Sequence, residues 1–248
     1  MAFTTAELRD GPVIALVSAV TSAIAPAARG LEREFPEACA WNLVDDRLIT
    51  EAIAAGGLTD DLRDRMTRLI RYALDGGAAA VLLTCSMYGP VAHEVAASVP
   101  VPILAADDAA FEAAAASGHE RIALVSSLPV PLADARERFA AFLRSRAGAP
   151  ELTGAPDFTG VPVFTGVLAA GAYAASAAPD ATGEARSPEA LAQALAAAVR
   201  GSDADAVLLA QYSLAPAAQR LAALAGVPVF SGPDAAARLL RSRLLPAG

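Results

Sequence analysis

Short apolar runs alternate along this chain with longer segments whose apolar positions recur every three or four residues. The clearest run, Val81-Leu82-Leu83, passes through Thr84-Cys85-Ser86 straight into a helix-like segment. Such a run is typical of a parallel strand that is buried on both faces. The clearest helix follows a Thr59-Asp60-Asp61 start, with apolar side chains on one face at Leu62, Met66, Leu69, Ile70 and Ala73.

The whole pattern predicts an α/β fold with parallel sheets and right-handed crossovers. We expect strands at 13–18, 40–44, 81 to the Cys85 region, 101–104, 121–126, 162–164, 207 to the Gln211 region and 227–230. Helices are expected from Thr21 or Ser22 toward 35, from 59 to the Gly76-Gly77 stop, after Cys85 to about 98, and at 108–117, 132–146, 188–200, after Gln211 to 225, and 234–240. The small, polar and breaker-rich segment 166–186 is either a mobile lid or a surface insertion.

The chain also repeats itself. The stretch 207–216 aligns without a gap to 81–90, an offset of 207 − 81 = 126, and the same offset relates Asp108 to Asp234. Gln211 stands at the position of Cys85. We interpret this as a duplication and predict two pseudo-symmetric lobes, each a parallel sheet flanked by helices, with the active site in the cleft between them. The first lobe would span 1–108, completed by a C-terminal helix at 232–248, and the second would span 109–231.

Charge and composition narrow the chemistry. A net charge of −8 speaks against a nucleic acid or an anionic membrane as partner. All 19 basic residues are Arg, so no lysine amine is available for a Schiff base. Two His and two Cys are too few to favour a structural zinc site. We therefore expect no metal site, chemistry without a cofactor, and a small molecule as partner; a homo-oligomer stays open.

The apolar run at 11–28 raises the question of an export signal or membrane helix. Acidic Glu7 and Asp10 stand ahead of it, where an export signal would carry basic residues. Its core, the sequence IALVS at 14–18, recurs at 122–126, where no export signal would lie. We therefore interpret the run as a first core strand and predict a cytoplasmic protein.

Several of these stretches together resemble the aspartate/glutamate racemase superfamily, which also includes hydantoin racemases, maleate isomerases and arylmalonate decarboxylases. They are the TSAIAP turn at 21–26, the NLVDD stretch at 42–46, the Thr84-Cys85-Ser86 motif and the internal repeat. The resemblance implies two pseudo-symmetric α/β lobes, catalysis without a cofactor, and one cysteine from each half. The first cysteine motif matches at Cys85. The second departs, because Gln211 stands where the second cysteine is expected.

Cys85 is the main catalytic candidate. At the end of a buried strand and the start of a helix, its thiol pKa would be lowered, which predicts a thiolate near neutral pH. The competing interpretation is a small buried hydrophobic side chain, the usual fate of a free cysteine. The helix-start amides of Ser86, Met87 and Tyr88 would face an anionic substrate.

Other polar residues at or just beyond strand ends would add donors for a substrate carboxylate. These candidates are Ser18, Thr21, Thr84, Ser126, Ser127, Gln211, Tyr212 and Ser213. The two tyrosines, Tyr88 and Tyr212, would either bind substrate or cover the cleft wall. Asp46 would either act as an acid/base group or serve a capping or solvated loop role.

Three functions stay open at this point. The first is a racemase or isomerase acting at the carbon next to a carboxylate, through an enediolate or a Cys85 adduct. The second is a decarboxylase in which Cys85 protonates one face, an alternative that suits a single thiol because the Gln211 amide cannot donate a proton at neutral pH. The third is a binding protein for small carboxylates without catalysis.

Overall fold

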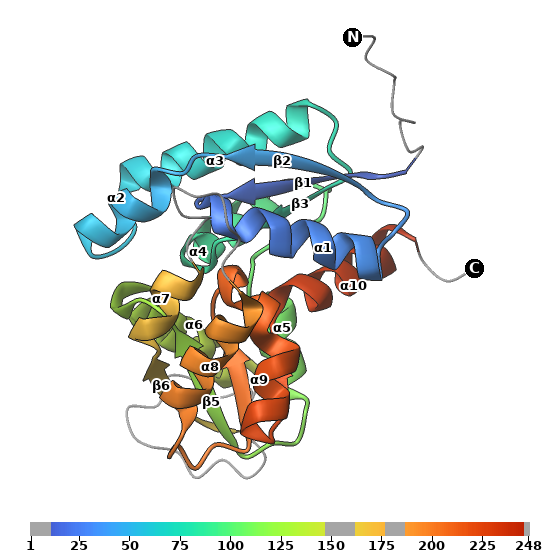
Figure 1. Cartoon of the computed structure of the whole chain (residues 1–248). Coiled ribbons are helices and arrows are strands. Elements are labelled where there is room, and N and C mark those ends of the chain that lie inside the picture. The colour runs from blue at the N-terminus through green and yellow to red at the C-terminus, as the bar shows by residue number, and fades with distance from the viewer. Residues whose placement is uncertain (1–10, 147–161, 177–186, 246–248) are drawn as a thin grey trace, which may run out of the picture.

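A computed structural model describes residues 11–146, 162–176 and 187–245 of the chain. Its strands form two parallel sheets (Figure 1). The first has the order β2-β1-β3-β4, and the second has the order β6-β5-β7-β8. The strands are β1 Val13–Ser18, β2 Cys39–Val44, β3 Ala80–Leu83, β4 Ile103–Leu104, β5 Arg121–Ser126, β6 Val163–Leu168, β7 Ala206–Leu209 and β8 Val229–Phe230. The predicted α/β fold with two similar parallel sheets is confirmed.

Helices flank both sheets (Figure 1). They are α1 Ile24–Glu34, α2 Leu48–Ala55, α3 Asp60–Asp75, α4 Gly89–Ala96, α5 Asp108–Ala115, α6 Pro129–Arg146, α7 Ala170–Ser176, α8 Pro188–Val199, α9 Ala218–Ala225 and α10 Gly232–Leu244. Three short 3-10 helices precede α1, α4 and α9: η1 Thr21–Ala23, η2 Ser86–Tyr88 and η3 Tyr212–Ala217.

Helix α3 shows how the sequence pattern becomes a packed element. Its N-cap, Thr59, accepts a hydrogen bond of 3.4 Å from the backbone N–H of Leu62. Four of its five predicted face residues are buried against the first sheet: Leu62, Met66, Ile70 and Ala73. Removing this apolar stripe from water is what holds the helix on the sheet.

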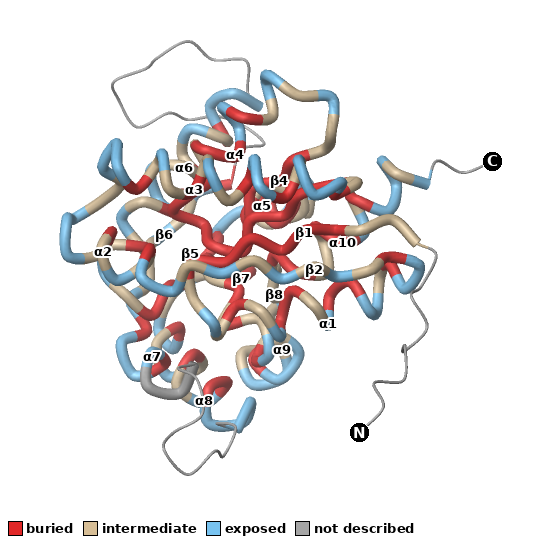
Figure 2. Tube along the Cα trace, turned by 90° about the horizontal axis from the view of Figure 1, so that it is seen from above, coloured by how far each residue is buried: buried red, intermediate tan, exposed pale blue. Residues whose placement is uncertain are grey.

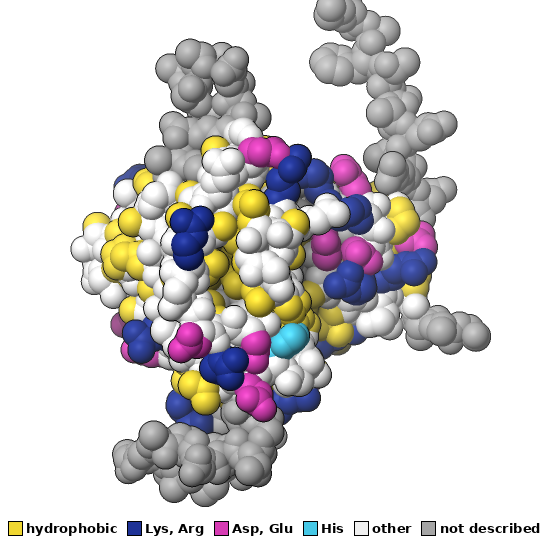
Figure 3. All heavy atoms as spheres, turned by 60° about the horizontal axis from the view of Figure 1, so that its bottom comes forward, with side chains coloured by type: hydrophobic (Ala, Val, Ile, Leu, Met, Phe, Trp, Pro, Cys, Tyr) yellow, Lys and Arg dark blue, Asp and Glu magenta, His cyan; other side chains and the backbone are white. Residues whose placement is uncertain are grey.

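Burial follows the strand order. In Figure 2 the inner strands are the most buried part of the molecule, and both β3 and β7 are buried at every position. The edge strands β2 and β6 alternate or are only partly buried, and Val163 in β6 is 68% exposed. Figure 3 shows the molecule from the side of the second sheet, with basic side chains beside acidic ones and hydrophobic side chains between them.

The last helix returns to the first sheet. Ala236, Ala237 and Leu240 of α10 share a core with Ile14 and Leu16 of β1, and α10 lies beside α1 (Figure 1). The chain therefore passes between the sheets twice, after β4 and after β8. The lobe boundaries 1–108, 109–231 and 232–248 stay predictions.

Two sequence expectations need correction. The strand expected at 162–164 continues as β6 to Leu168, and α7 follows at Ala170–Ser176, so the segment 166–186 begins with regular structure over its described part. Residues 177–186 lie outside the described residues. Helix α2 was not expected, yet it forms and ends at Gly56, whose left-handed φ of 74° suits glycine. Within the described ranges, no helix combines the length and apolar character needed to span a membrane.

Candidate active site

The two sheets deliver one residue each to a shared site. In the first sheet Val17 pairs with Leu83, and in the second Val125 pairs with Leu209. Cys85 lies two residues beyond Leu83, and Gln211 lies two residues beyond Leu209. Ligands of open α/β sheets bind at this carboxyl edge of the strands.

Cys85 and Gln211 line the same small cavity, which has a volume of about 30 Å³. A cavity of this size holds about one water molecule. Its walls contain no ionisable group other than Cys85 and Tyr212. The lining residues are Val20, Ala23, Ile49, Thr84, Cys85, Ser86, Met87, Pro131, Gln211, Tyr212 and Ser213.

The Cys85 thiol is not the thiolate that its place in the sequence predicts. The side chain is buried, with 7% of the residue exposed. Burial raises the pKa of the thiol from 9.0 to about 12, against a hydrogen bond from the Met87 amide that lowers it. Desolvation therefore outweighs the helix start, and the thiol keeps its proton at neutral pH.

The amides after Cys85 are also engaged differently from our expectation. The Tyr88 N–H donates to the carbonyl oxygen of Cys85 at 3.2 Å, which closes the η2 turn. The Met87 N–H bonds to Cys85 itself. A substrate would therefore not find these two amides free to hold its carboxylate.

The Gln211 side chain is held in one orientation. Its Oε1 accepts hydrogen bonds from the Ser127 N–H at 2.7 Å, from Ser127 Oγ at 2.9 Å and from Ser126 Oγ at 3.0 Å. A backbone N–H can only donate, so the contacted atom must be the carbonyl oxygen of the amide. The amide NH₂ is then the remaining group of Gln211 that can serve a ligand.

The two tyrosines take different places. Tyr88 is fully buried, and its hydroxyl donates to the Leu48 carbonyl oxygen at 3.1 Å. It belongs to the core of the first lobe and does not line the cavity. Tyr212 does line the cavity, and its buried hydroxyl has no hydrogen-bond partner among the described residues. Burial raises the pKa of Tyr212 well above its usual value, so it is a neutral group.

The other candidates divide into three groups. Thr84, Ser86, Met87 and Ser213 line the cavity with Cys85, as expected for a shared site. Ser18, Ser126 and Ser127 lie behind it: Ser18 Oγ accepts from Thr84 Oγ1 at 2.8 Å, and the other two hold Gln211. Thr21 and Asp46 are exposed and are not among the lining residues.

Sequence reasoning missed the apolar wall of the cavity. Val20 and Ala23 come from the turn after β1, Ile49 from α2 and Pro131 from the start of α6. Of these four residues only Ala23 lies in a stretch singled out from the sequence, the TSAIAP turn that contributes to the family resemblance. No group of three or more His, Cys, Asp or Glu side chains in the described ranges is arranged to hold a metal ion.

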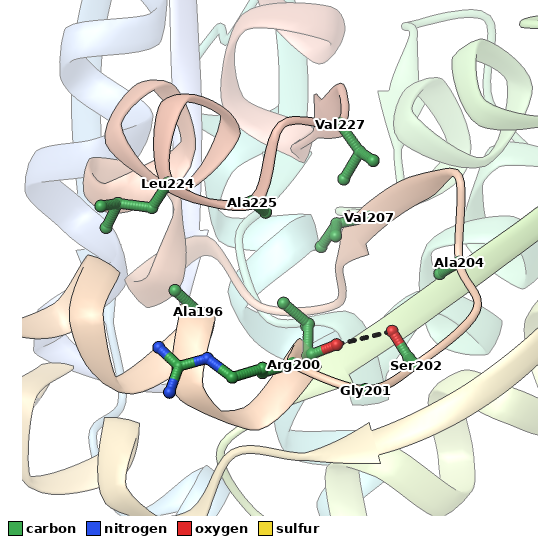
Figure 4. Close-up of a pocket in the computed structure, with 10 residues that line it drawn as sticks. Ala196, Arg200, Gly201, Ser202, Ala204, Val207, Leu224, Ala225 and Val227 are labelled. Atoms are coloured by element: carbon green, nitrogen blue, oxygen red, sulfur yellow. Dashed lines mark hydrogen bonds between the residues drawn. The ribbon is translucent and has the colours of Figure 1, made fainter.

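A second hollow lies at the opposite edge of the second sheet. It has a volume of about 260 Å³ and is lined by the ends of α8 and α9 and the residues leading into β7 and β8 (Figure 4). Figure 4 shows its apolar wall, including Val207, Leu224 and Val227, and the hydrogen bond of 2.7 Å from Ser202 Oγ to the Val199 carbonyl oxygen. This is the amino edge of the strands, away from Cys85, so we assign the reaction site to the smaller cavity.

Comparisons with solved structures give the same fold. A glutamate racemase from Francisella tularensis in complex with D-glutamate is 11% identical, with a TM-score of 0.65 over 97% of this chain and 85% of that one. Allantoin racemase from Klebsiella pneumoniae is 18% identical, with a TM-score of 0.62 over 94% and 87%. A glycine-to-cysteine mutant of arylmalonate decarboxylase is 20% identical, with a TM-score of 0.57 over 96% and 94%.

Sequence comparison gives two further results. No curated protein matches this chain. The family model described as Asp/Glu/Hydantoin racemase matches residues 17–240, a span that runs from the end of β1 into α10 and takes in all the residues that line the cavity. With the duplicated fold and the Cys85 strand end in place, this match shows that the chain belongs to the Asp/Glu/hydantoin racemase family.

Proposed function

We propose that this chain is a cofactor-independent enzyme of the isomerase type that acts at the carbon next to a carboxylate, with Cys85 as its acid/base group. One observation carries the proposal: Cys85 and Gln211 reach one cavity from equivalent strand ends, and only one of them can transfer a proton. The substrate is a small carboxylic acid.

The neutral donors around Cys85 suit an enediolate. The hydroxyls of Ser86 and Ser213 and the NH₂ of Gln211 are available from the cavity wall. Hydrogen-bond donors fixed around a developing negative charge stabilise it more in a buried site than in water. They hold the carboxylate oxygens while the neighbouring carbon gains or loses its proton.

The Cys85 thiol then transfers its proton to one face of the enediolate carbon. Because its pKa is raised to about 12, it holds a proton at neutral pH and gives it to the carbon of an enediolate, a much stronger base. The S–H bond breaks, a C–H bond forms, and a thiolate remains. In the isomerase this thiolate takes a proton from the carbon next to the carboxylate of the next substrate, whose C–H electron pair becomes the enediolate; in the decarboxylase it takes a proton from water. The cavity holds about one water molecule, so its walls must separate before a substrate binds.

Decarboxylation is a second candidate, and Gln211 favours it. Racemisation needs an acid/base group on each face of the reacting carbon, whereas protonation after loss of CO₂ needs only one such group. In that reaction the C–C bond to one carboxylate breaks, its electron pair becomes the enediolate, and Cys85 protonates the carbon. The anchored amide of Gln211 supplies no second proton.

The test measures the incorporation of deuterium into the substrate or product and the release of CO₂. The protein is incubated in deuterated water with small 2-substituted carboxylic acids and, separately, with 2-substituted malonic acids. NMR then detects deuterium at the carbon next to the carboxylate, and released CO₂ is measured. Cys85→Ala should abolish either reaction, while the matched variant Cys39→Ser should retain it.

The outcomes separate the three functions. Exchange or double-bond migration without CO₂ supports the isomerase, and CO₂ release with a single deuterium in the product supports the decarboxylase. Calorimetric binding of a carboxylate with neither reaction would overturn the enzyme and leave a binding protein.

A further inference from the structure

Three charged side chains, one buried and two partly buried, lie next to the turn that carries Cys85. Arg138 of α6 forms an ion pair with Asp107, with 2.6 Å between Nη1 and Oδ2. It forms a second with Asp134, one helical turn earlier, with 2.8 Å between Nε and Oδ2. The side chain of Arg138 is 17% exposed and that of Asp107 is 5% exposed. Buried charges are costly even when paired, and replacing such a cluster with apolar residues often costs nothing, so packing alone does not require it.

The cluster joins three parts of the fold. Asp107 lies where the chain leaves β4 for α5; it is the N-cap of α5, yet its side chain makes no capping bond and pairs with Arg138 instead. Arg138 belongs to α6, which packs against η2. Its guanidinium also lies against Gly89, the first residue of α4, where an added Cβ would be 3.5 Å from Nη1. Gly89 is four residues beyond Cys85.

The geometry around Arg138 is not what stability alone would select. Its Nη2 is buried and has no hydrogen-bond partner among the described residues. Leaving a donor unpaired in the interior is unfavourable. The guanidinium carbon lies 5.7 Å from the centre of the Phe111 ring, which adds a cation–π contact and fixes the plane of the group.

All three charges are close enough to Cys85 to act on its thiol. Asp107 and Asp134 favour the protonated thiol and Arg138 favours the thiolate. Tyr88 is the other titratable group that interacts with Cys85. On the outer side of the cluster, His93 lies 3.0 Å from Asp108 and is largely exposed. With two acids and one base, the ionised cluster carries a net charge of 1 − 2 = −1.

We propose that Arg138 is a positioning residue for Cys85: held between Asp107 and Asp134, it fixes α6 to the turn that carries the thiol and gives that turn net negative surroundings. The inference rests on the proposed function for the role of the thiol as proton donor. The two acids add to the effect of burial in keeping the proton on sulfur, and the arginine holds them in place.

The test measures the thiol directly and needs no substrate. Wild-type protein and variants are alkylated with iodoacetamide at one alkaline pH, and peptide mapping gives the rate at Cys85 apart from that at Cys39. Asp134→Asn removes a negative charge at a partly exposed position, so Cys85 should be alkylated at least about threefold faster. Arg138→Gln removes the positive charge, so Cys85 should react no faster than in the wild type.

Two further variants serve as controls. Arg138→Lys keeps the charge and should leave the alkylation rate within about twofold of the wild type. Arg146→Gln removes an arginine of the same helix that pairs with Glu112 at the surface, and it should change nothing. Both also cover the case in which Arg138→Gln does not fold.

Loosening of the fold predicts a different pattern, because it would expose Cys85 and speed alkylation in Asp134→Asn and Arg138→Gln alike. That result, or an unchanged rate in Asp134→Asn, would overturn the inference. A wild-type protein without turnover on any acid would count against the proposed function and leave this rate comparison intact.

Discussion

The backbone N–H of Ser127 donates a hydrogen bond of 2.7 Å to Oε1 of Gln211, at the strand end of the second lobe that is equivalent to the Cys85 strand end of the first lobe. Two hydroxyls donate to the same oxygen. These hydrogen bonds fix the amide of Gln211 within the second lobe. At equivalent strand ends of the internal repeat, the first lobe carries a thiol and the second carries an anchored amide.

This exchange predicts the effect of Gln211→Cys. The variant places a thiol opposite Cys85, and cysteine is smaller than glutamine, so steric cost is small. We expect it to racemise an acid product that the wild type leaves optically pure, as measured by chiral chromatography. Adding Cys85→Ala should abolish the new activity, because both faces are needed. A wild-type protein that already racemises its product would show instead that a second base exists.

Removing the acceptor has a separate cost. Gln211→Met keeps the length of the side chain and removes the acceptor of the Ser127 N–H and the Ser127 hydroxyl, while the Ser126 hydroxyl can still donate to the Leu128 carbonyl oxygen at 3.1 Å. We expect the free energy of unfolding to fall by about 1–3 kcal/mol, measured by urea denaturation. An unchanged stability would mean that water replaces Gln211 Oε1 at no cost.

Thiol labelling should follow exposure. Cys39 is half-buried at the start of β2, while Cys85 is buried and its pKa is raised. We expect limited iodoacetamide at neutral pH to alkylate Cys39 before Cys85, as read by peptide mapping. The sequence alone favours the reverse order. Labelling of Cys85 first would show that the cavity opens readily and that the thiol ionises there.

Alkaline stability should also depend on Cys85. Its pKa is about 12 in the folded state against 9.0 ordinarily, so the folded protein keeps this proton to higher pH than the unfolded chain. Below about pH 9 the thiol is protonated in both states, so its ionisation does not affect the free energy of unfolding. As the pH rises from there toward 12, only the unfolded chain loses the proton, and the free energy of unfolding falls. Between about pH 8 and about pH 10.5, the wild type should lose about 2 kcal/mol more than Cys85→Ala in urea denaturation. Comparing the two slopes cancels the part of the raised Tyr88 pKa that comes from burial, and the part that comes from Cys85 counts with Cys85.

Tyr88 should prove structural. Its hydroxyl donates to the Leu48 carbonyl oxygen, so Tyr88→Phe leaves a buried acceptor unpaired. We expect a loss of about 1 kcal/mol in stability and an unchanged KM for the substrate acid. A raised KM with unchanged stability would restore the role in substrate binding that its sequence position suggests.

The sequence predicts the sheets far better than the environment of the site. The runs around Leu82 and Leu208 are apolar because both faces of their strands are buried, so the order of elements follows from local pattern. Helix α2 was missed because it is short and follows the Asp45-Asp46 pair directly. The end of β6 beyond the predicted strand at 162–164, and helix α7, were missed because glycine and alanine leave little hydrophobic pattern.

The protonation state of Cys85 follows from distant parts of the chain. A helix start lowers a thiol pKa by an effect that is visible in local sequence, whereas burial depends on walls that arrive from elsewhere. One wall comes from Ile49 of α2 and another from Pro131 of α6. Asp107 and Arg138 meet only in the folded chain, and the Asp134–Arg138 ion pair, although its four-residue spacing is local, was not predicted.

The two passages of the chain between the sheets touch each other. An added Cβ at Gly232, where α10 begins, would lie 2.6 Å from the carbonyl oxygen of Ala106 and 2.4 Å from the Tyr212 ring. Two tethers in contact act mechanically as a single hinge, which leaves the halves rotation about that point and little sliding or separation. A molecule would therefore reach Cys85 and Gln211 when the two lobes rotate apart about this hinge, and it would enter from the side away from Gly232.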